Sequence, residues 1–164
     1  MELKGPVHID FFDVDHTITH HASGWNFARF GIKRNLFPLR ALISLPFYYV
    51  QYRYGSFTSD IFHKGLNIFR GLRRTDLEKV ALESFDKKLK KDIHDDAFRA
   101  ILTLKEAGRM VALATSSLEV IVKPLADYLG VDKIIATQLE YIDGICTGNF
   151  ASPPVFGPEK MKRD

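Results

Sequence analysis

The chain has 164 residues, a hydrophobic content of 46% and a formal net charge of +3, which suits one globular unit of ordinary core size. Its single cysteine, Cys146, excludes an internal disulfide framework and is typical of a reducing compartment, so we expect a cytoplasmic protein. Residues 1–7 are polar, and we expect no secretory signal there.

The first predicted element is a short, apolar, aromatic-rich strand over Val7–Val14. Asp13 and Asp15 stand at its end. Carboxylates beside a buried run are costly unless they are paired, bound to a metal or used in chemistry. These two residues are therefore the leading functional candidates. The alternative is a loop pair that is satisfied by backbone donors.

The segment that follows is basic and aromatic. Between Ala28 and Arg74 it carries nine Lys or Arg against one acid, and twelve of the chain's 20 aromatic residues fall between Trp25 and Phe69. This shift in composition predicts a separate, mostly helical subdomain. Glycine and proline residues predict that it is divided into several short helices, at Gly31, Pro38, Pro46, Gly55 and Gly71.

Within this segment, Leu36–Tyr54 is apolar and aromatic but contains Arg40 and two prolines. It is too short and too interrupted to span a bilayer. Two interpretations stay open: a helix that packs on its neighbours, or an interfacial patch that places aromatic groups in an anionic membrane surface. No recognised nucleic-acid-binding module is present, and we expect no nucleic acid partner.

The next elements are helices. Thr75 and Glu78 form a capping-box pattern, in which the Thr75 hydroxyl accepts from the Glu78 N–H and Glu78 reaches back. A second helix is predicted over Asp95–Ala107, with Gly108 as its stop.

A second buried strand is predicted over Met110–Ala114, and it breaks at Thr115–Ser117. These hydroxyls suit the N-cap of a following helix, an anion site, or both. The remaining predicted elements are a helix that ends at Leu129-Gly130, a strand over Lys133–Thr137, a hairpin over Tyr141–Thr147 and a helix opened by Gly157–Lys160.

Strands that alternate with helices predict an α/β fold with a mainly parallel sheet and helices on both faces. Ligands of such sheets bind at the carboxyl ends of the strands. Asp13 and Asp15 fall at one such end, and Thr115 and Ser116 fall at the next. With a lysine such as Lys160 in the first turn of a later helix, this set suits phosphoryl transfer, which needs in-line placement and neutralisation of phosphate charge.

Three motifs, in order, resemble those of the haloacid dehalogenase superfamily of aspartyl-phosphate phosphatases. They are "DVDHT" from Asp13, "VALATSS" from Val111 and "GPEK" from Gly157. "DGICTGNF" from Asp143 is similar to a hairpin of the phosphoserine-phosphatase-like branch. The resemblance implies a Rossmann-like three-layer core over residues 1–18 and 91–164, with a helical cap inserted over residues 19–90.

The resemblance also implies roles for individual residues. Asp13 is the implied nucleophile, and Asp15 the acid that protonates the leaving alcohol and then activates water. The Asp13 carboxylate and the Asp15 backbone carbonyl are the implied ligands of Mg²⁺, a cation that prefers hard oxygen donors. Implied phosphate contacts are Thr115, Ser116 and Lys160, and Thr17, Ser23 and Arg40 are further candidates for substrate contact.

Two departures from the family pattern have consequences. The fourth motif of the family, an acidic cluster that completes the Mg²⁺ site, is missing before Asp164, and the strand that carries it would lie beside the first strand. We therefore expect a bare edge at Val7–Val14, which would favour self-association. Either the chain is a fragment of a longer one, or something else covers that edge. Phosphoserine phosphatases carry a glutamate nine residues after the nucleophile, where this chain has Ala22. Phosphoserine is therefore a disfavoured substrate, and a small or lipid-like phosphomonoester is expected.

Two alternative interpretations stay open. His16, His20 and His21 stand near the two aspartates and suggest a transition-metal site. A catalytically impaired domain that binds a phosphorylated ligand or an anionic membrane, which would make the protein membrane-peripheral, is the alternative to a phosphatase.

Overall fold

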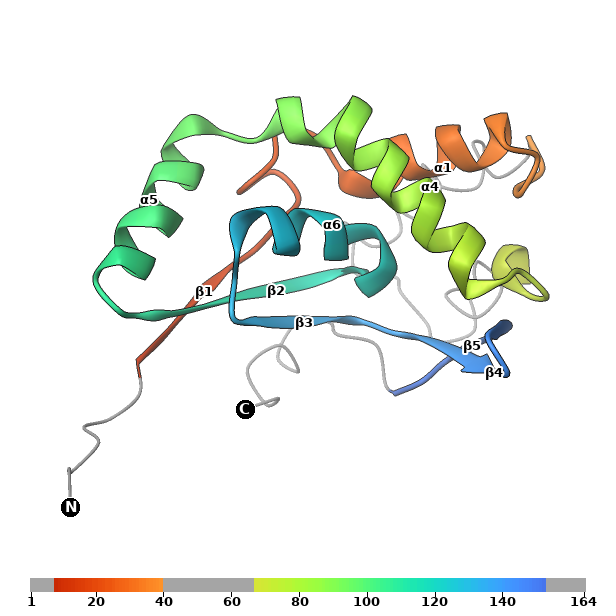
Figure 1. Cartoon of the computed structure of the whole chain (residues 1–164). Coiled ribbons are helices and arrows are strands. Elements are labelled where there is room, and N and C mark those ends of the chain that lie inside the picture. The colour runs from red at the N-terminus through yellow and green to blue at the C-terminus, as the bar shows by residue number, and fades with distance from the viewer. Residues whose placement is uncertain (1–7, 40–66, 153–164) are drawn as a thin grey trace, which may run out of the picture.

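The computed structural model describes residues 8–39 and 67–152. A parallel sheet lies at its centre, in the strand order β1-β2-β3 (Figure 1). The strands are β1 (Ile9–Phe12), β2 (Met110–Leu118) and β3 (Lys133–Thr137). Parallel strands joined through helices confirm the predicted α/β fold class. The first strand is shorter than predicted, and Val7 lies outside the described residues.

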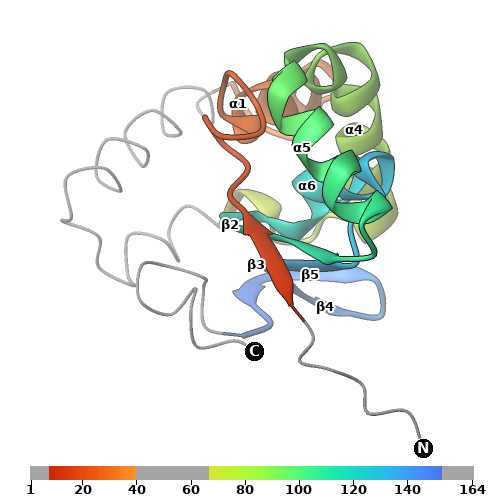
Figure 2. The same ribbon diagram turned by 90° about the vertical axis from the view of Figure 1, so that its left-hand side faces the viewer.

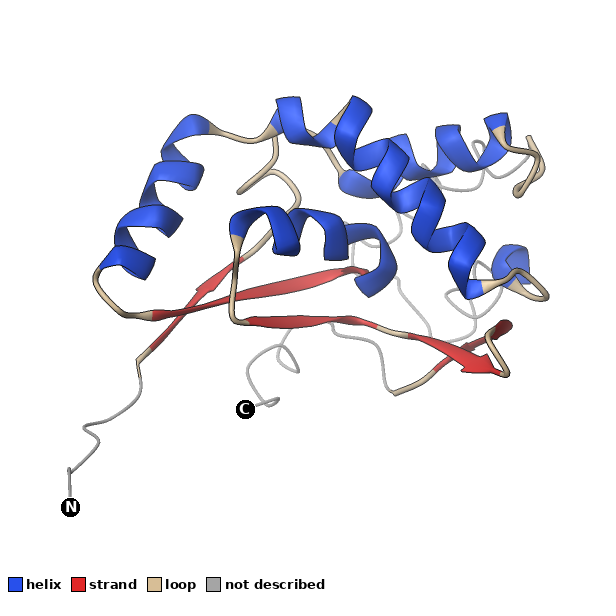
Figure 3. Cartoon of the chain, viewed as in Figure 1, coloured by secondary structure: helices blue, strands red, loops and turns tan. Residues whose placement is uncertain are grey.

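The helices α4, α5 and α6 lie together on one side of this sheet (Figures 1 and 3). The predicted helix opened by Gly157–Lys160 lies outside the described residues. The helical elements, in chain order, are α1 (Ser23–Lys33), η1 (Asn67–Phe69), α4 (Arg74–Lys87), η2 (Leu89–Asp92), α5 (Asp95–Glu106) and α6 (Glu119–Leu129).

The strand β1 is the edge of the sheet within the described part of the chain, as the view toward it in Figure 2 shows. This agrees with the expected open edge at the first strand. Whether a second chain pairs with that edge stays a prediction.

A two-stranded antiparallel sheet, β4 (Leu139–Ile142) and β5 (Ile145–Phe150), follows β3. Its turn residues Asp143 and Gly144 have φ values of 50° and 78°. Positive φ at both positions is what a type I′ hairpin turn requires, and Asp-Gly is a preferred pair for it. The predicted hairpin is therefore confirmed.

Two buried clusters hold the described elements together. The first packs α5 and α6 against the sheet, around Leu113, Val122 and Leu125. The second is aromatic and joins Phe27 of α1 and Phe69 of η1 to α4, α6 and the hairpin, and it includes Leu77, Ile121, Leu139 and Cys146. Helix α4 contributes to both clusters, with Phe85 in the first and Leu77 in the second.

The capping box predicted at Thr75 does not form. Helix α4 begins at Arg74, and its N-cap residue is Arg73, two residues before Thr75, with no side-chain cap. The reason is the hairpin: Arg73 pairs with Ile145, and the Arg74 N–H donates to the carbonyl oxygen of Gly144 at 2.8 Å. A tertiary contact thus satisfies the helix start that a local side chain was expected to satisfy.

Gly31 was expected to end a helix, but it lies inside α1 and is buried. A Cβ built there would fall 2.1 Å from ring atoms of Phe37, so glycine is required by close packing rather than by a break in the helix. No helix in the described part of the chain is long and apolar enough to cross a membrane. Most of Leu36–Tyr54 lies outside the described residues.

Candidate active site

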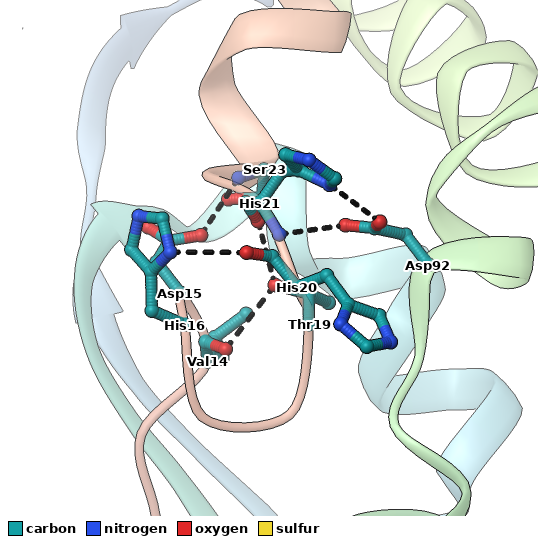
Figure 4. Close-up of polar contacts among 8 residues, drawn as sticks. All are labelled: Val14, Asp15, His16, Thr19, His20, His21, Ser23 and Asp92. Carbon is teal, nitrogen blue, oxygen red and sulfur yellow. Dashed lines mark hydrogen bonds and ion pairs between the residues drawn. The ribbon is translucent and has the colours of Figure 1, made fainter.

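The loop after β1 is wound tightly around one carbonyl oxygen. The N–H groups of Thr17, Ile18 and Thr19 all donate to the oxygen of Val14, at 3.2, 2.9 and 3.1 Å. The Thr19 hydroxyl also reaches that oxygen, at 3.2 Å (Figure 4). A short loop with this many internal bonds fixes Asp15, which lies within it, and holds Asp13, which lies just before it.

His16 closes the same loop with a left-handed backbone conformation, at φ 62°. Its ring Nδ1 donates to the carbonyl oxygen of His20 at 3.0 Å. Because a carbonyl only accepts, this contact requires the tautomer with a proton on Nδ1. His16 therefore helps to close the turn (Figure 4).

The sequence predicted that the second strand ends before Thr115. In the structure β2 continues to Leu118 and has a bulge at Thr115–Ser117. Ala114 lies opposite Ile135 and Leu118 lies opposite Thr137, so residues 115–117 of β2 stand against the single residue Ala136 of β3, and two of them are extra. The Thr137 hydroxyl donates to the carbonyl oxygen of Ser116 at 3.1 Å and holds the bulge. Bulges commonly re-aim side chains next to functional sites.

The prediction that the hydroxyls of Thr115–Ser117 cap the next helix is wrong. Helix α6 begins at Glu119, its N-cap residue is Leu118, and that residue makes no side-chain cap. Thr115–Ser117 therefore do not cap this helix, because the bulge separates them from its first turn.

Asp15 connects the two strand ends. Its Oδ2 accepts from the Ser117 hydroxyl at 2.6 Å, across 102 residues of sequence. Its Oδ1 accepts from the backbone N–H of Ser23 at 2.7 Å, at the first residue of α1 (Figure 4). Both carboxylate oxygens thus have fixed donors, one from the β2 bulge and one from a helix N-terminus, where a negative charge is favoured.

The predicted site residues divide into three groups by location. Asp13 and Thr17 are exposed on the loop after β1. Thr115 and Ser23 are each 1% exposed, and Ser116 is half-buried. Lys160 and Arg40 lie outside the described residues. The roles of all of these toward phosphate or substrate stay predictions.

The histidines do not converge on a metal site. Among the described residues, no group of three or more His, Cys, Asp or Glu is placed to hold a metal ion. His21 is instead paired through Nδ1 with Asp92 at 2.7 Å, and the His20 ring lies 3.7 Å from the His94 ring. A zinc-type site needs three or four nitrogen or sulfur ligands. The described residues therefore do not favour the transition-metal interpretation.

The oxygen donors at the end of β1 fit Mg²⁺ better. Mg²⁺ keeps several waters and is commonly held by one or two carboxylates together with substrate phosphate. Asp13 is an exposed carboxylate at the strand end, and so it can meet both water and a phosphate. The donor set of Asp13 and the Asp15 carbonyl is all oxygen, in keeping with that preference.

Sequence reasoning missed two residues of this region. Ser117 was noted only as part of a hydroxyl cluster, yet it is the member that contacts Asp15. Asp92 had no assigned role, yet it binds His21 through both the ring and the backbone N–H. Neither contact leaves a local signal, because each joins segments far apart in the chain.

A family model described as haloacid dehalogenase-like hydrolase matches residues 11–163. Among curated proteins, the chain is 23% identical over 156 residues to an "Inhibition of morphological differentiation protein" of Streptomyces azureus. The match covers 93% of this chain and 56% of that relative, so the chain spans little more than half of the relative's length.

Two solved structures are also similar. A protein of unknown function from Bordetella pertussis Tohama I matches with a TM-score of 0.81 and 25% identity, over 96% of this chain and 73% of that one. A phospho-aspartyl intermediate analogue of phosphoserine phosphatase matches with a TM-score of 0.58 and 20% identity, over 89% of this chain and 63% of that one. The second likeness is one of fold.

Proposed function

Because the chain belongs to the haloacid dehalogenase-like hydrolase family, we propose that it is a Mg²⁺-dependent phosphomonoesterase that acts through an aspartyl-phosphate on Asp13. The proposed organisation is a catalytic core over residues 1–18 and 91–164, with a helical cap over residues 19–90. Closure of such a cap would exclude water and select the substrate.

The contact between Asp15 and Ser117 carries this proposal. It brings the end of β1, with its two aspartates, against the β2 bulge that holds Thr115 and Ser116. The residues proposed as nucleophile, acid and phosphate-binding hydroxyls thus belong to the carboxyl ends of adjacent parallel strands, where ligands of such sheets bind. Phosphoryl transfer depends mainly on this kind of positioning.

In the proposed first step, an oxygen of the Asp13 carboxylate attacks phosphorus, and the bond from phosphorus to the ester oxygen breaks. The proton of Asp15 passes to that ester oxygen, which leaves as the alcohol. Thr115 and Ser116 hold phosphate oxygens, and Lys160 is the proposed cation for the remaining charge.

In the second step, Asp15, now a carboxylate, removes a proton from water. The water oxygen attacks phosphorus, the bond to Asp13 breaks, and inorganic phosphate leaves with both aspartates restored. One residue thus serves as acid and then as base, which requires that it stay aimed at the same place through both steps.

Mg²⁺, held by the Asp13 carboxylate and the Asp15 backbone carbonyl, would neutralise phosphate charge. The proposed substrate is a small or lipid-like phosphomonoester. Phosphoserine is disfavoured, because Ala22 has no group that pairs with a substrate amine. Ala22 precedes α1 as its N-cap residue, seven residues beyond Asp15.

The experiment is hydrolysis of p-nitrophenyl phosphate with Mg²⁺ or with EDTA, by the protein and by its Asp13→Asn variant. The expected result is turnover that needs Mg²⁺ and is lost in a variant with an unchanged circular dichroism spectrum. Hydrolysis that persists in Asp13→Asn excludes Asp13 as the nucleophile. No turnover by the unsubstituted protein favours the alternative, a domain that binds phosphorylated ligands without hydrolysing them.

A further inference from the structure

We propose that Ser117 is a positioning residue that holds Asp15 in the orientation needed for proton transfer. This role deepens the proposed function and rests on it. Ser117 is not one of the residues proposed to bind the phosphate. It acts through Asp15, to which its hydroxyl donates at 2.6 Å.

The two contacts of Asp15 differ in kind. At Oδ1 the donor is a backbone N–H, that of Ser23, which can only donate. At Oδ2 the donor is the Ser117 hydroxyl, which can donate or accept. The Ser117 hydroxyl is therefore the contact of Asp15 that a substitution can remove, because the donor at Oδ1 belongs to the backbone.

A residue that is the acid in one step and the base in the next must keep its place through both. The Ser117 hydroxyl donates to Oδ2, and a carboxylate oxygen can accept more than one hydrogen bond, so this contact holds Asp15 without using up Oδ2. An alanine at position 117 would leave Oδ2 without this partner and the side chain held at Oδ1 alone.

Ser117 is itself fixed in place. Its backbone N–H donates to Oγ1 of Thr115 at 3.1 Å, and its Oγ lies 3.3 Å from Oγ of Ser23. Thr115 and Ser23 are both buried. Asp15, the proposed acid, is thus linked through Ser117 to the β2 bulge. The same contacts would therefore position Asp15 relative to a phosphate bound at that bulge.

The test uses two substrates that need the acid to different degrees. p-Nitrophenolate leaves without much protonation, whereas the alkoxide of glycerol 2-phosphate needs a proton. The comparison uses kcat/KM, because it reports the steps through departure of the alcohol. General acid catalysis raises the reaction rate by about 10²–10⁴-fold, and an acid that is out of place provides only part of this increase.

In Ser117→Ala, we expect kcat/KM to fall about 10-fold or more for glycerol 2-phosphate and about 3-fold or less for p-nitrophenyl phosphate. Ser117→Thr, which keeps the hydroxyl, should restore most of the loss. Thr103→Ala removes an exposed hydroxyl that donates within α5 and serves as the control. Equal losses for both substrates, or no rescue by threonine, would overturn the positioning role.

A second measurement needs no turnover. Amide hydrogen exchange at Ser23 reports the bond to Oδ1 of Asp15, and it should speed up in Ser117→Ala if Asp15 swings away. Unchanged exchange, together with unchanged substrate discrimination, overturns the proposal. If the unsubstituted protein hydrolyses neither ester, the proposed phosphatase function is wrong. Exchange at Ser23 that is unchanged in Ser117→Ala would then show, separately, that Ser117 does not hold Asp15 in place.

Discussion

Asp92 binds His21 at two points, across 71 residues of sequence. Its Oδ2 accepts from the His21 backbone N–H at 2.9 Å, and its Oδ1 accepts from the ring Nδ1 at 2.7 Å (Figure 4). The backbones are joined as well, because the His20 N–H donates to the Asp92 carbonyl oxygen and Thr19 pairs with Ile93. The chain segments that enter and leave residues 19–90 are therefore fastened side by side.

Asp92→Ala should lower the free energy of unfolding by about 1 kcal/mol, since a net hydrogen bond contributes about that much and the His21 ring is 78% exposed. Asp127→Ala is the control, because Asp127 pairs with Lys123 only on the exposed face of α6, and it should change that free energy by about 0.5 kcal/mol or less. Urea denaturation measures both. Equal effects of the two substitutions would mean that the double contact adds no stability.

Substitution of two glycines of the same helix by alanine should have different effects on the free energy of unfolding. In α1, a Cβ at Gly31 would meet the ring of Phe37, which is 4% exposed, at 2.1 Å, whereas nothing lies within 4 Å of a Cβ at Gly24. Gly31→Ala should destabilise by about 1–3 kcal/mol through overpacking. Gly24→Ala should be neutral or stabilise by up to about 1 kcal/mol.

Thermal unfolding of both variants measures the difference. A Gly31→Ala protein as stable as the Gly24→Ala protein would show that Phe37 does not pack against α1 as described.

The sequence predicted elements well where the signal is local. The strand over Lys133–Thr137 is set by a short apolar run, and the stop at Gly108 with φ 72° and the hairpin turn at Asp143-Gly144 are set by turn residues. The start of α4 was misplaced because it is set by the hairpin, through the N–H of Arg74 and the carbonyl of Gly144. No pattern within the helix records that contact.

In the candidate site, too, features with a local sequence signal could be predicted and features set by tertiary contacts could not. The strand-end positions of Asp13 and Asp15 follow from the apolar run before them, so those residues could be found from the sequence. The extra residues in β2 could not, because a bulge depends on the register against β3, where Leu118 lies opposite Thr137. That bulge decides which hydroxyl of the cluster meets Asp15.

Tyr141 predicts a pH dependence of stability. Burial is the main cause that raises its pKa to about 12 from an ordinary 10. The unfolded chain therefore loses this proton first, and the stability tied to it is fully present below pH 10 and is lost as the pH rises toward 12. Among the described residues its hydroxyl has no hydrogen-bond partner.

Tyr141→Phe should thus unfold at the same or a slightly higher urea concentration at pH 7, because removing a buried hydroxyl without a partner costs little. Between pH 10 and pH 12 the variant should lose less stability than the unsubstituted protein. An identical slope in the two proteins would show that Tyr141 titrates normally in the folded state.

Asp15→Asn separates the two proposed steps. An asparagine can keep both contacts of Asp15, since its Oδ1 accepts from the Ser23 N–H and its amide donates to the Ser117 hydroxyl, so the fold should be unchanged. It can neither give a proton to a leaving group nor take one from water. With p-nitrophenyl phosphate, whose leaving group needs little protonation, the attack by Asp13 should still occur while hydrolysis of the phosphorylated enzyme slows by about 10²–10⁴-fold.

Rapid mixing should then show a burst of about one p-nitrophenol per protein, and Asp13→Asn should show none. A steady rate without a burst in Asp15→Asn, at the level of the unsubstituted protein, would show that another group activates the water.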